Sequence, residues 1–131
     1  MTELSNKEMN RTLPTLLYFF SAAQHFAGEV RKVPDLNRVV EEIYVCGSVG
    51  RFSPTPRDID ILVFGKNISE EHRKQLFQLR IEEDESLRAE LLRTFPSLQE
   101  AVVQSYIDLE INNLKKREYI ERNDPMSMKK L

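Results

Sequence analysis

The segment DIDILVF, residues 58–64, constrains the fold of this chain more than any other segment. Apart from its two aspartates it is apolar and rich in β-branched residues, and Gly65 ends it, which is typical of a strand in a protein core. Two further segments have a similar character: IYVC, residues 43–46, and VQSYIDLEI, about residues 103–111. We therefore predict a sheet that contains these three strands.

Segments with helical periodicity flank and separate the strands. Their order along the chain is helix, strand, strand, helix, strand, helix, which predicts an α+β fold with helices packed against a sheet. Within the second long helix, an interruption near residues 84–86 stays open. The tail MSMKKL, residues 126–131, is expected to be frayed. The helices are expected over residues 13–31, 35–41, 69–95 and 113–123.

The helix expected over residues 13–31 is apolar on two faces. Such a helix is usually buried on both sides, either within its own domain or partly by another chain, and both interpretations stay open. The acidic segment IEEDES, residues 81–86, is expected to be a solvated helix face.

Length and charge limit the classes of function. With 131 residues the chain fits a single domain, residues 1–131. A formal net charge of −2 provides no positive field to collect nucleic acid, so a nucleic-acid partner is not expected. Cys46 is the only cysteine, which suits a reducing compartment, and neither a spanning helix nor a signal peptide fits the sequence well. The cytoplasm is the expected location.

Acidic residues recur on alternate positions of two predicted strands. Because strand side chains alternate between faces, Asp58 and Asp60 share one face, and Asp108 lies with Tyr106 and Glu110 on one face of the later strand. Pairing of the two strands in a suitable register would gather Asp58, Asp60 and Asp108 in one patch. Three such charges repel one another, so we expect a cation among them.

Oxygen ligands without clustered histidine or cysteine favour Mg²⁺ or Mn²⁺, and proteins often hold Mg²⁺ by carboxylates together with substrate phosphates. The turn before the aspartates supplies the complementary part. Gly47 lets the backbone approach a ligand, and Ser48 offers a hydroxyl and an amide at the start of a short helix. Taken singly, each of these features is more often an ordinary turn or strand end; their combination predicts a nucleotide site.

These residues resemble the nucleotidyltransferase superfamily that includes DNA polymerase beta and the minimal nucleotidyltransferases. The resemblance covers about residues 35–112 and consists of a Gly-Ser turn after the first strand, an Asp-x-Asp at the head of the second and a third Asp on a later strand. It implies a mixed sheet and two metal ions, Mg²⁺ or Mn²⁺. The matching residues are Gly47, Ser48, Asp58, Asp60 and Asp108.

The resemblance also implies a reaction, the transfer of a nucleoside monophosphate, AMP if the triphosphate is ATP, to an acceptor hydroxyl. Asp58 and Asp60 would hold both ions, and Asp108 would ligate one ion and help to deprotonate the acceptor. Gly47 and Ser48 would hold phosphates. Minimal members of the superfamily often act beside a helical partner protein, as the antitoxin of a toxin pair, so a helical partner or a homo-oligomer is expected.

Two arginines near the turn are further candidates, since Arg51 and Arg57 carry guanidinium groups that suit phosphate oxygens; a solvated surface role is the alternative. For the remaining polar residues we expect structural roles: packing for His25 and Cys46, solvent exposure for His72, and a surface position for Glu110. Two other functions stay open: a small-molecule transferase of the aminoglycoside type, which would use the acids of residues 81–86, and a non-catalytic binding module.

Overall fold

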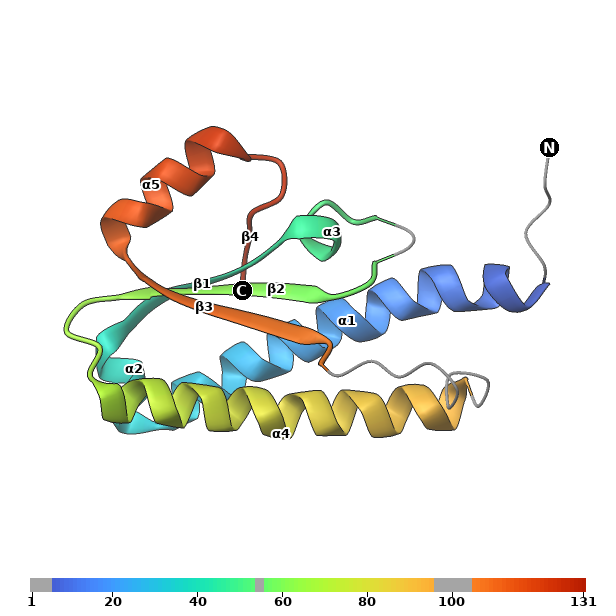
Figure 1. Cartoon of the computed structure of the whole chain (residues 1–131), viewed down its shortest axis with the longest axis horizontal. Coiled ribbons are helices and arrows are strands. Elements are labelled where there is room, and N and C mark those ends of the chain that lie inside the picture. The colour runs from blue at the N-terminus through green and yellow to red at the C-terminus, as the bar shows by residue number, and fades with distance from the viewer. Residues whose placement is uncertain (1–5, 54–55, 96–104) are drawn as a thin grey trace.

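A four-stranded sheet in the order β3-β2-β1-β4 lies at the centre of the fold (Figure 1). The computed structural model describes residues 6–53, 56–95 and 105–131, and side chains from residue 16 onward. Only β2 and β3 run parallel; β1 pairs antiparallel with both β2 and β4, so the sheet is mixed, as the resemblance implies. The strands are β1 (Val40–Cys46), β2 (Ile59–Gly65), β3 (Ile107–Asn113) and β4 (Lys129–Lys130).

Two long helices cover one face of the sheet, and a shorter helix lies on the other. Figure 1 shows α1 (Asn6–Lys32) and α4 (Glu70–Thr94) side by side under the sheet, with α2 (Pro34–Val39) at their end. The helix α5 (Leu114–Asn123) lies above the opposite face, and the single turn α3 (Gly47–Gly50) follows β1. Because α4 joins two parallel strands, it forms the crossover that such a connection requires.

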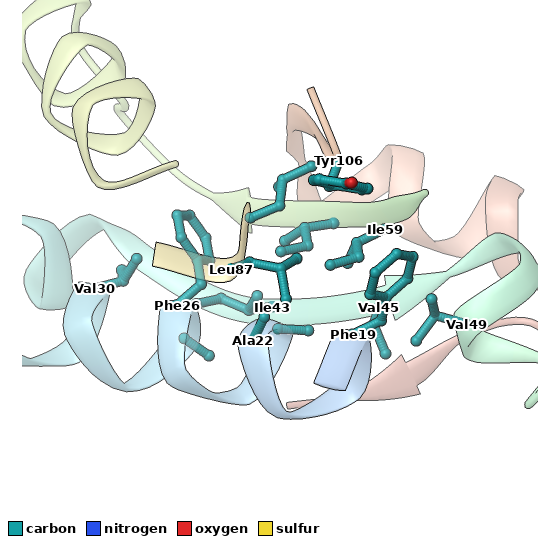
Figure 2. Packing of buried hydrophobic residues seen from close by; sticks show 14 of the residues in the cluster. Phe19, Ala22, Phe26, Val30, Ile43, Val45, Val49, Ile59, Leu87 and Tyr106 are labelled. Atoms are coloured by element: carbon teal, nitrogen blue, oxygen red, sulfur yellow. The ribbon is translucent and has the colours of Figure 1, made fainter. Parts of the chain in front are cut away.

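The core lies between the sheet and the pair α1 and α4. Alternate residues of β1 and β2 point into it, among them Ile43, Val45 and Ile61, which are fully buried. Figure 2 shows Ile43 and Val45 packed against Phe19 and Phe26 of α1. Both apolar faces of α1 are covered within the chain from residue 16 onward, with the exception of Leu17, whose exposed fraction is 71%.

Short-range signals set the starts of the helices. At the first turn of α4, the Ser69 hydroxyl accepts the His72 backbone N–H (3.1 Å) and the His72 ring nitrogen accepts the Ser69 backbone N–H (3.0 Å). This reciprocal cap satisfies two donors that the helix leaves free. His72 is therefore part of a cap, whereas the sequence interpretation assigned it to solvent alone. The first turn of α5 is capped by Asn113, which accepts from the backbone of Lys116.

The prediction that residues 81–86 form a solvated face is wrong at its centre. Glu83 and Asp84 are buried. The Asp84 carboxylate accepts the backbone N–H groups of Tyr106 (2.6 Å) and Ile107 (3.1 Å), where β3 begins, and pairs with Arg88 at 3.3 Å. A carboxylate that accepts such bonds holds α4 to the strand. The interruption considered near this point does not occur, since α4 is continuous.

The assignments of His25 and Tyr106 also need correction. His25 was expected to pack in the core, but 61% of its side chain is exposed; its ring contacts Glu83 and lies 3.4 Å from Glu29. Tyr106 was expected beside the acidic residues, but it precedes β3 and is buried against Phe19, with ring centroids 5.6 Å apart. The alternation of the strand therefore begins at residue 107.

The prediction of a frayed tail is wrong. Lys129 and Lys130 form β4, and the Leu131 N–H donates to the Ile43 carbonyl at 2.8 Å. Other boundaries shift by a few residues: α1 begins before residue 13, β1 begins before residue 43, and β3 extends to residue 113, while residues 103–104 lie outside the described residues. None of the described helices combines the length and apolar character that crossing a membrane requires.

Candidate functional site

Three carboxylates meet at one end of the two parallel strands. Asp60 lies on β2 and Asp108 on β3, and the parallel register places these two residues opposite each other. Asp58 precedes β2 by one residue and lies on the side of Asp60. One carboxylate oxygen from each of the three residues lies within 4.8 Å of the other two, close enough for a shared metal ion. The chain thus gathers the acids that the sequence analysis singled out.

Burial and neighbouring negative charge make Asp58 and Asp60 harder to ionise than isolated carboxyl groups. The pKa of Asp60 is raised from 3.8 to about 6, first by burial and then by the negative charges of Asp58 and Asp108. Burial, followed by the charge of Asp108, also raises the pKa of Asp58. Because like charges at this separation disfavour the ionised forms, a bound cation would stabilise this end of the sheet.

The turn after β1 lies directly against the carboxylates. Gly47 has φ of 65°, and a Cβ built on it would lie 2.2 Å from an Asp60 carboxylate oxygen, so no larger residue fits without moving that group. The adjacent turn α3 has only four residues and too small a dipole to bind an anion by itself. Backbone and carboxylate therefore approach each other here only because residue 47 lacks a side chain.

The hydroxyl of Ser48 is a candidate contact for a ligand at this turn. Its oxygen is buried and has no hydrogen-bond partner among the described residues. Buried polar groups in proteins nearly always have a partner, so an unpaired one calls for an explanation. A phosphate oxygen is a suitable partner for it. The donor set of three carboxylates and one unpaired hydroxyl, without nitrogen or thiolate ligands, fits Mg²⁺ or Mn²⁺ together with a phosphate group.

The two candidate arginines have different surroundings. Arg51 follows α3 and pairs with Asp124 at 3.4 Å; its positive charge also partly offsets the rise in the pKa of Asp60. Arg57 is exposed and precedes Asp58. The sequence analysis missed Asp124, because its contact with Arg51 spans 73 residues and no local pattern marks it.

Cys46 lies on the acidic face of the sheet, so its assignment to the core is wrong. It is half-buried and pairs across the strands with Asp60. Burial, followed by the charge of Asp60, raises the pKa of its thiol to about 12. Since the thiolate is the reactive form, the raised pKa makes this thiol a poor nucleophile near neutral pH. Alternation from the buried Ile43 and Val45 would have placed it correctly.

Glu110 has a partner of its own. Its carboxylate lies 2.6 Å from the Lys116 ammonium group at the start of α5, and both side chains are about half exposed. Within residues 6–53, 56–95 and 105–131, the only set of three or more metal-ligating side chains close enough to share one ion is Asp58, Asp60 and Asp108. Glu110 thus keeps the surface role expected for it.

A hollow of about 190 Å³ opens beside the carboxylates. Its volume is below the usual range for small-molecule pockets, about 300 to 1,000 Å³. A nucleotide bound at the carboxylates would therefore extend beyond the hollow onto the open surface. Cys46, Asp60, Leu62, Asp108 and Glu110 are among the residues that line it.

Comparisons with known proteins yield one distant structural likeness. No family model and no curated protein matches this chain. A crystal structure from Sulfolobus solfataricus, provisionally described as that of a nucleotidyltransferase, aligns over 99% of this chain and 90% of its own, with a TM-score of 0.45 and 16% sequence identity. This likeness is too distant to indicate a function.

Proposed function

We propose that the protein is a metal-dependent nucleotidyltransferase, which moves a nucleoside monophosphate from a nucleoside triphosphate onto a hydroxyl group. The observation that carries this proposal is the set of three carboxylates within 4.8 Å of one another, directly against the Gly47 turn. The unpaired Ser48 hydroxyl supports it, because it marks where a phosphate oxygen would find a donor.

In the proposed reaction, the acceptor oxygen forms a bond to the α-phosphorus of the triphosphate. The bond between that phosphorus and the oxygen bridging to the β-phosphate breaks, and pyrophosphate leaves with the electron pair. Asp108, the most exposed of the three carboxylates, accepts the proton of the acceptor hydroxyl. Mg²⁺ or Mn²⁺, held by Asp58, Asp60 and Asp108, would neutralise the charge that develops on the phosphate oxygens.

The turn and the arginines would bind the leaving phosphates. The Ser48 hydroxyl and the backbone N–H groups near Gly47 donate to phosphate oxygens, and Arg51 and Arg57 supply guanidinium groups. ATP is the proposed donor, so that AMP is the group transferred. This choice follows from the resemblance to the minimal nucleotidyltransferases.

For the acceptor we propose a hydroxyl on a partner protein, as in the antitoxin systems that the resemblance implies. The hollow of about 190 Å³ is small, and the carboxylates face open surface, so a large acceptor can reach them. An acidic attraction site for a cationic small molecule finds less support. Glu83 and Asp84 are buried in contacts on α4, on the face of the sheet opposite to the three carboxylates.

The direct test is label transfer. The purified protein is incubated with ATP labelled at the α-phosphate, Mg²⁺ and a lysate of its host, beside the Asp58→Asn, Asp60→Asn double variant. We expect label on a protein with the wild type, a loss of at least about 100-fold with the double variant, and no label when EDTA removes the metal.

A matched control is Asp35→Asn, which removes one exposed carboxylate that pairs with Arg38 away from the site. It should transfer label like the wild type. Label that persists in the double variant, or its absence from every protein and small molecule in the lysate, would count against the proposal. Label on a small molecule alone would leave the chemistry standing and exclude the protein acceptor.

A further inference from the structure

The last described segment of the chain, residues 124–131, holds the turn beside the three carboxylates in place. Ser127 is buried, and its backbone oxygen lies so close to Gly50 that a Cβ on that glycine would come within 1.7 Å of it. The ammonium group of Lys129 lies 5.4 Å from the centre of the Phe52 ring. We refer to residues 124–131 as the C-terminal segment; it contacts α3 and the residues that follow α3.

Asp124 begins this segment and is its only carboxylate side chain. One of its oxygens lies 3.4 Å from Arg51, and the side chains are 45% and 53% exposed, respectively. Exposed ion pairs of this kind contribute little, from about 0 to 1 kcal/mol. A triphosphate presents several oxygens with a higher charge, and guanidinium groups bind such oxygens in pairs. The contact between Arg51 and Asp124 is therefore weak enough to be exchanged.

We propose that Asp124 is an internal competitor of the triphosphate: it pairs with Arg51 in the nucleotide-free protein and must release Arg51 before that side chain binds phosphate. This inference rests on the proposed function. It makes Asp124 a positioning residue, which acts through Arg51 and needs no contact with the substrate. The Asp124 carboxylate lowers the affinity for nucleotide and keeps the Arg51 side chain at the edge of the site.

The neighbourhood of the pair supports this role. The Arg51 backbone N–H donates to the Gly47 carbonyl at 3.0 Å, and Gly47 lies directly against the Asp60 carboxylate, which places the pair of Arg51 and Asp124 beside the turn. Arg51 follows directly after α3, whose Ser48 hydroxyl lacks a partner. Release of Asp124 would leave the Arg51 guanidinium free to bind a phosphate held at this turn.

The test is a double-mutant cycle on nucleotide affinity. Titration calorimetry measures binding of Mg²⁺ with α,β-methylene ATP, which cannot react, to the wild type, Asp124→Asn, Arg51→Gln and the double variant. We expect Asp124→Asn to bind about two- to fivefold more tightly, which is the effect of removing a weak competing ion pair. Arg51→Gln should bind more weakly, and Asp124→Asn should have no further effect in that background.

The cycle separates this role from other effects of the same charge. If Asp124→Asn tightens binding equally in the Arg51→Gln background, Asp124 acts by general repulsion of anions and the proposal is wrong. Unchanged or weaker binding by Asp124→Asn also overturns it. Asp124→Glu keeps the charge and should bind like the wild type, while tighter binding by it would contradict the proposal.

Two controls complete the design. Asp35→Asn removes a comparable exposed carboxylate and should leave affinity unchanged. The melting temperature of Asp124→Asn should stay within about 2 °C of the wild type, because the exposed pair adds little stability. If the wild type binds the analogue and Asp124→Asn binds it with the same affinity, only this inference is wrong. Wild-type protein that neither binds it nor transfers label refutes the proposed function as well.

Discussion

The two faces of the central sheet come from the same strands and differ sharply where β2 and β3 begin. The face toward α1 and α4 carries Ile59, Ile61 and Ile107, which are almost completely buried. The opposite face carries Asp60 and Asp108, partly exposed and mutually repulsive. Alternation of side chains along a strand allows this, since neighbouring residues belong to different environments.

Residues that stabilise the fold and residues that serve the proposed function are therefore direct neighbours in the sequence. Burial of the apolar face supplies favourable free energy, whereas the crowded carboxylates on the other face oppose folding. Sites built for function commonly reduce stability in this way, and the rest of the structure offsets the loss. Substitutions on the apolar face should accordingly change mainly the free energy of unfolding, and substitutions on the acidic face should also change metal binding.

The largest expected effect is on the apolar face. Phe26 of α1 is fully buried in the core, so Phe26→Ala should lower the free energy of unfolding by about 3 to 5 kcal/mol through lost burial and the cavity left behind. Urea denaturation followed by circular dichroism measures it. The control Leu17→Ala, at a side chain that is 71% exposed, should change stability by less than about 0.5 kcal/mol. Similar losses in both variants would mean that α1 is not packed as described.

A pair of glycines sharpens the comparison at an intermediate scale. Gly47→Ala places a Cβ against the Asp60 carboxylate at a backbone conformation that alanine disfavours, so we expect a loss of about 1 to 3 kcal/mol and weaker Mn²⁺ binding. A Cβ built on Gly28 in α1 meets no atom within 4 Å, so Gly28→Ala should raise the free energy of unfolding by about 0.5 to 1 kcal/mol. Denaturation and Mn²⁺ titration measure both effects. Full metal binding by Gly47→Ala would show that the turn and the carboxylates are independent.

The smallest expected effect concerns pH. The folded-state pKa of Asp60, about 6, lies above its ordinary value of 3.8, so the folded protein holds a proton that the unfolded chain has released. Without metal, this group therefore makes stability fall as pH rises from about 4 to 6, with little further change above. Since Asp60 is partly exposed, solvent screening limits the effect to about 1 kcal/mol.

Urea midpoints between pH 4 and 7.5, measured in EDTA, test this sign against Asp60→Asn. The stability of the variant should fall much less between pH 4 and 6, and the variant should be more stable than the wild type at pH 7. Addition of Mg²⁺ should raise the stability of the wild type near neutral pH and have a smaller effect on the variant. A wild type that matches Asp60→Asn throughout would show that the acidic face carries no electrostatic cost.

Local patterns were sufficient to predict most elements of this fold. The apolar segment of β2, the cap at Ser69 and the alternation of Asp58 and Asp60 depend on neighbouring residues, and such patterns are visible in the sequence. The same alternation indicated that Asp108 would join them once the strands paired. The direction and the register of that pairing were not predictable, because they depend on how α4 crosses the sheet.

The errors at residues 81–86 and in the tail have a common physical cause. Asp84 has the sequence context of a solvated acidic face, but the start of β3 brings two backbone N–H groups to it from more than 20 residues away. In the same way β1 provides an edge on which Lys129 and Lys130 pair. Polar residues gain such partners only through tertiary structure, so local composition assigns them to solvent.

The parallel pairing of Asp60 with Asp108 also affects how the protein matures. These two residues are separated by the whole of α4, and non-local pairings of this kind form late because a long loop must close first. A chain that has folded only its first two strands has two of the three carboxylates and lacks the third. Assembly of the acidic cluster thus requires that β3 has paired with β2.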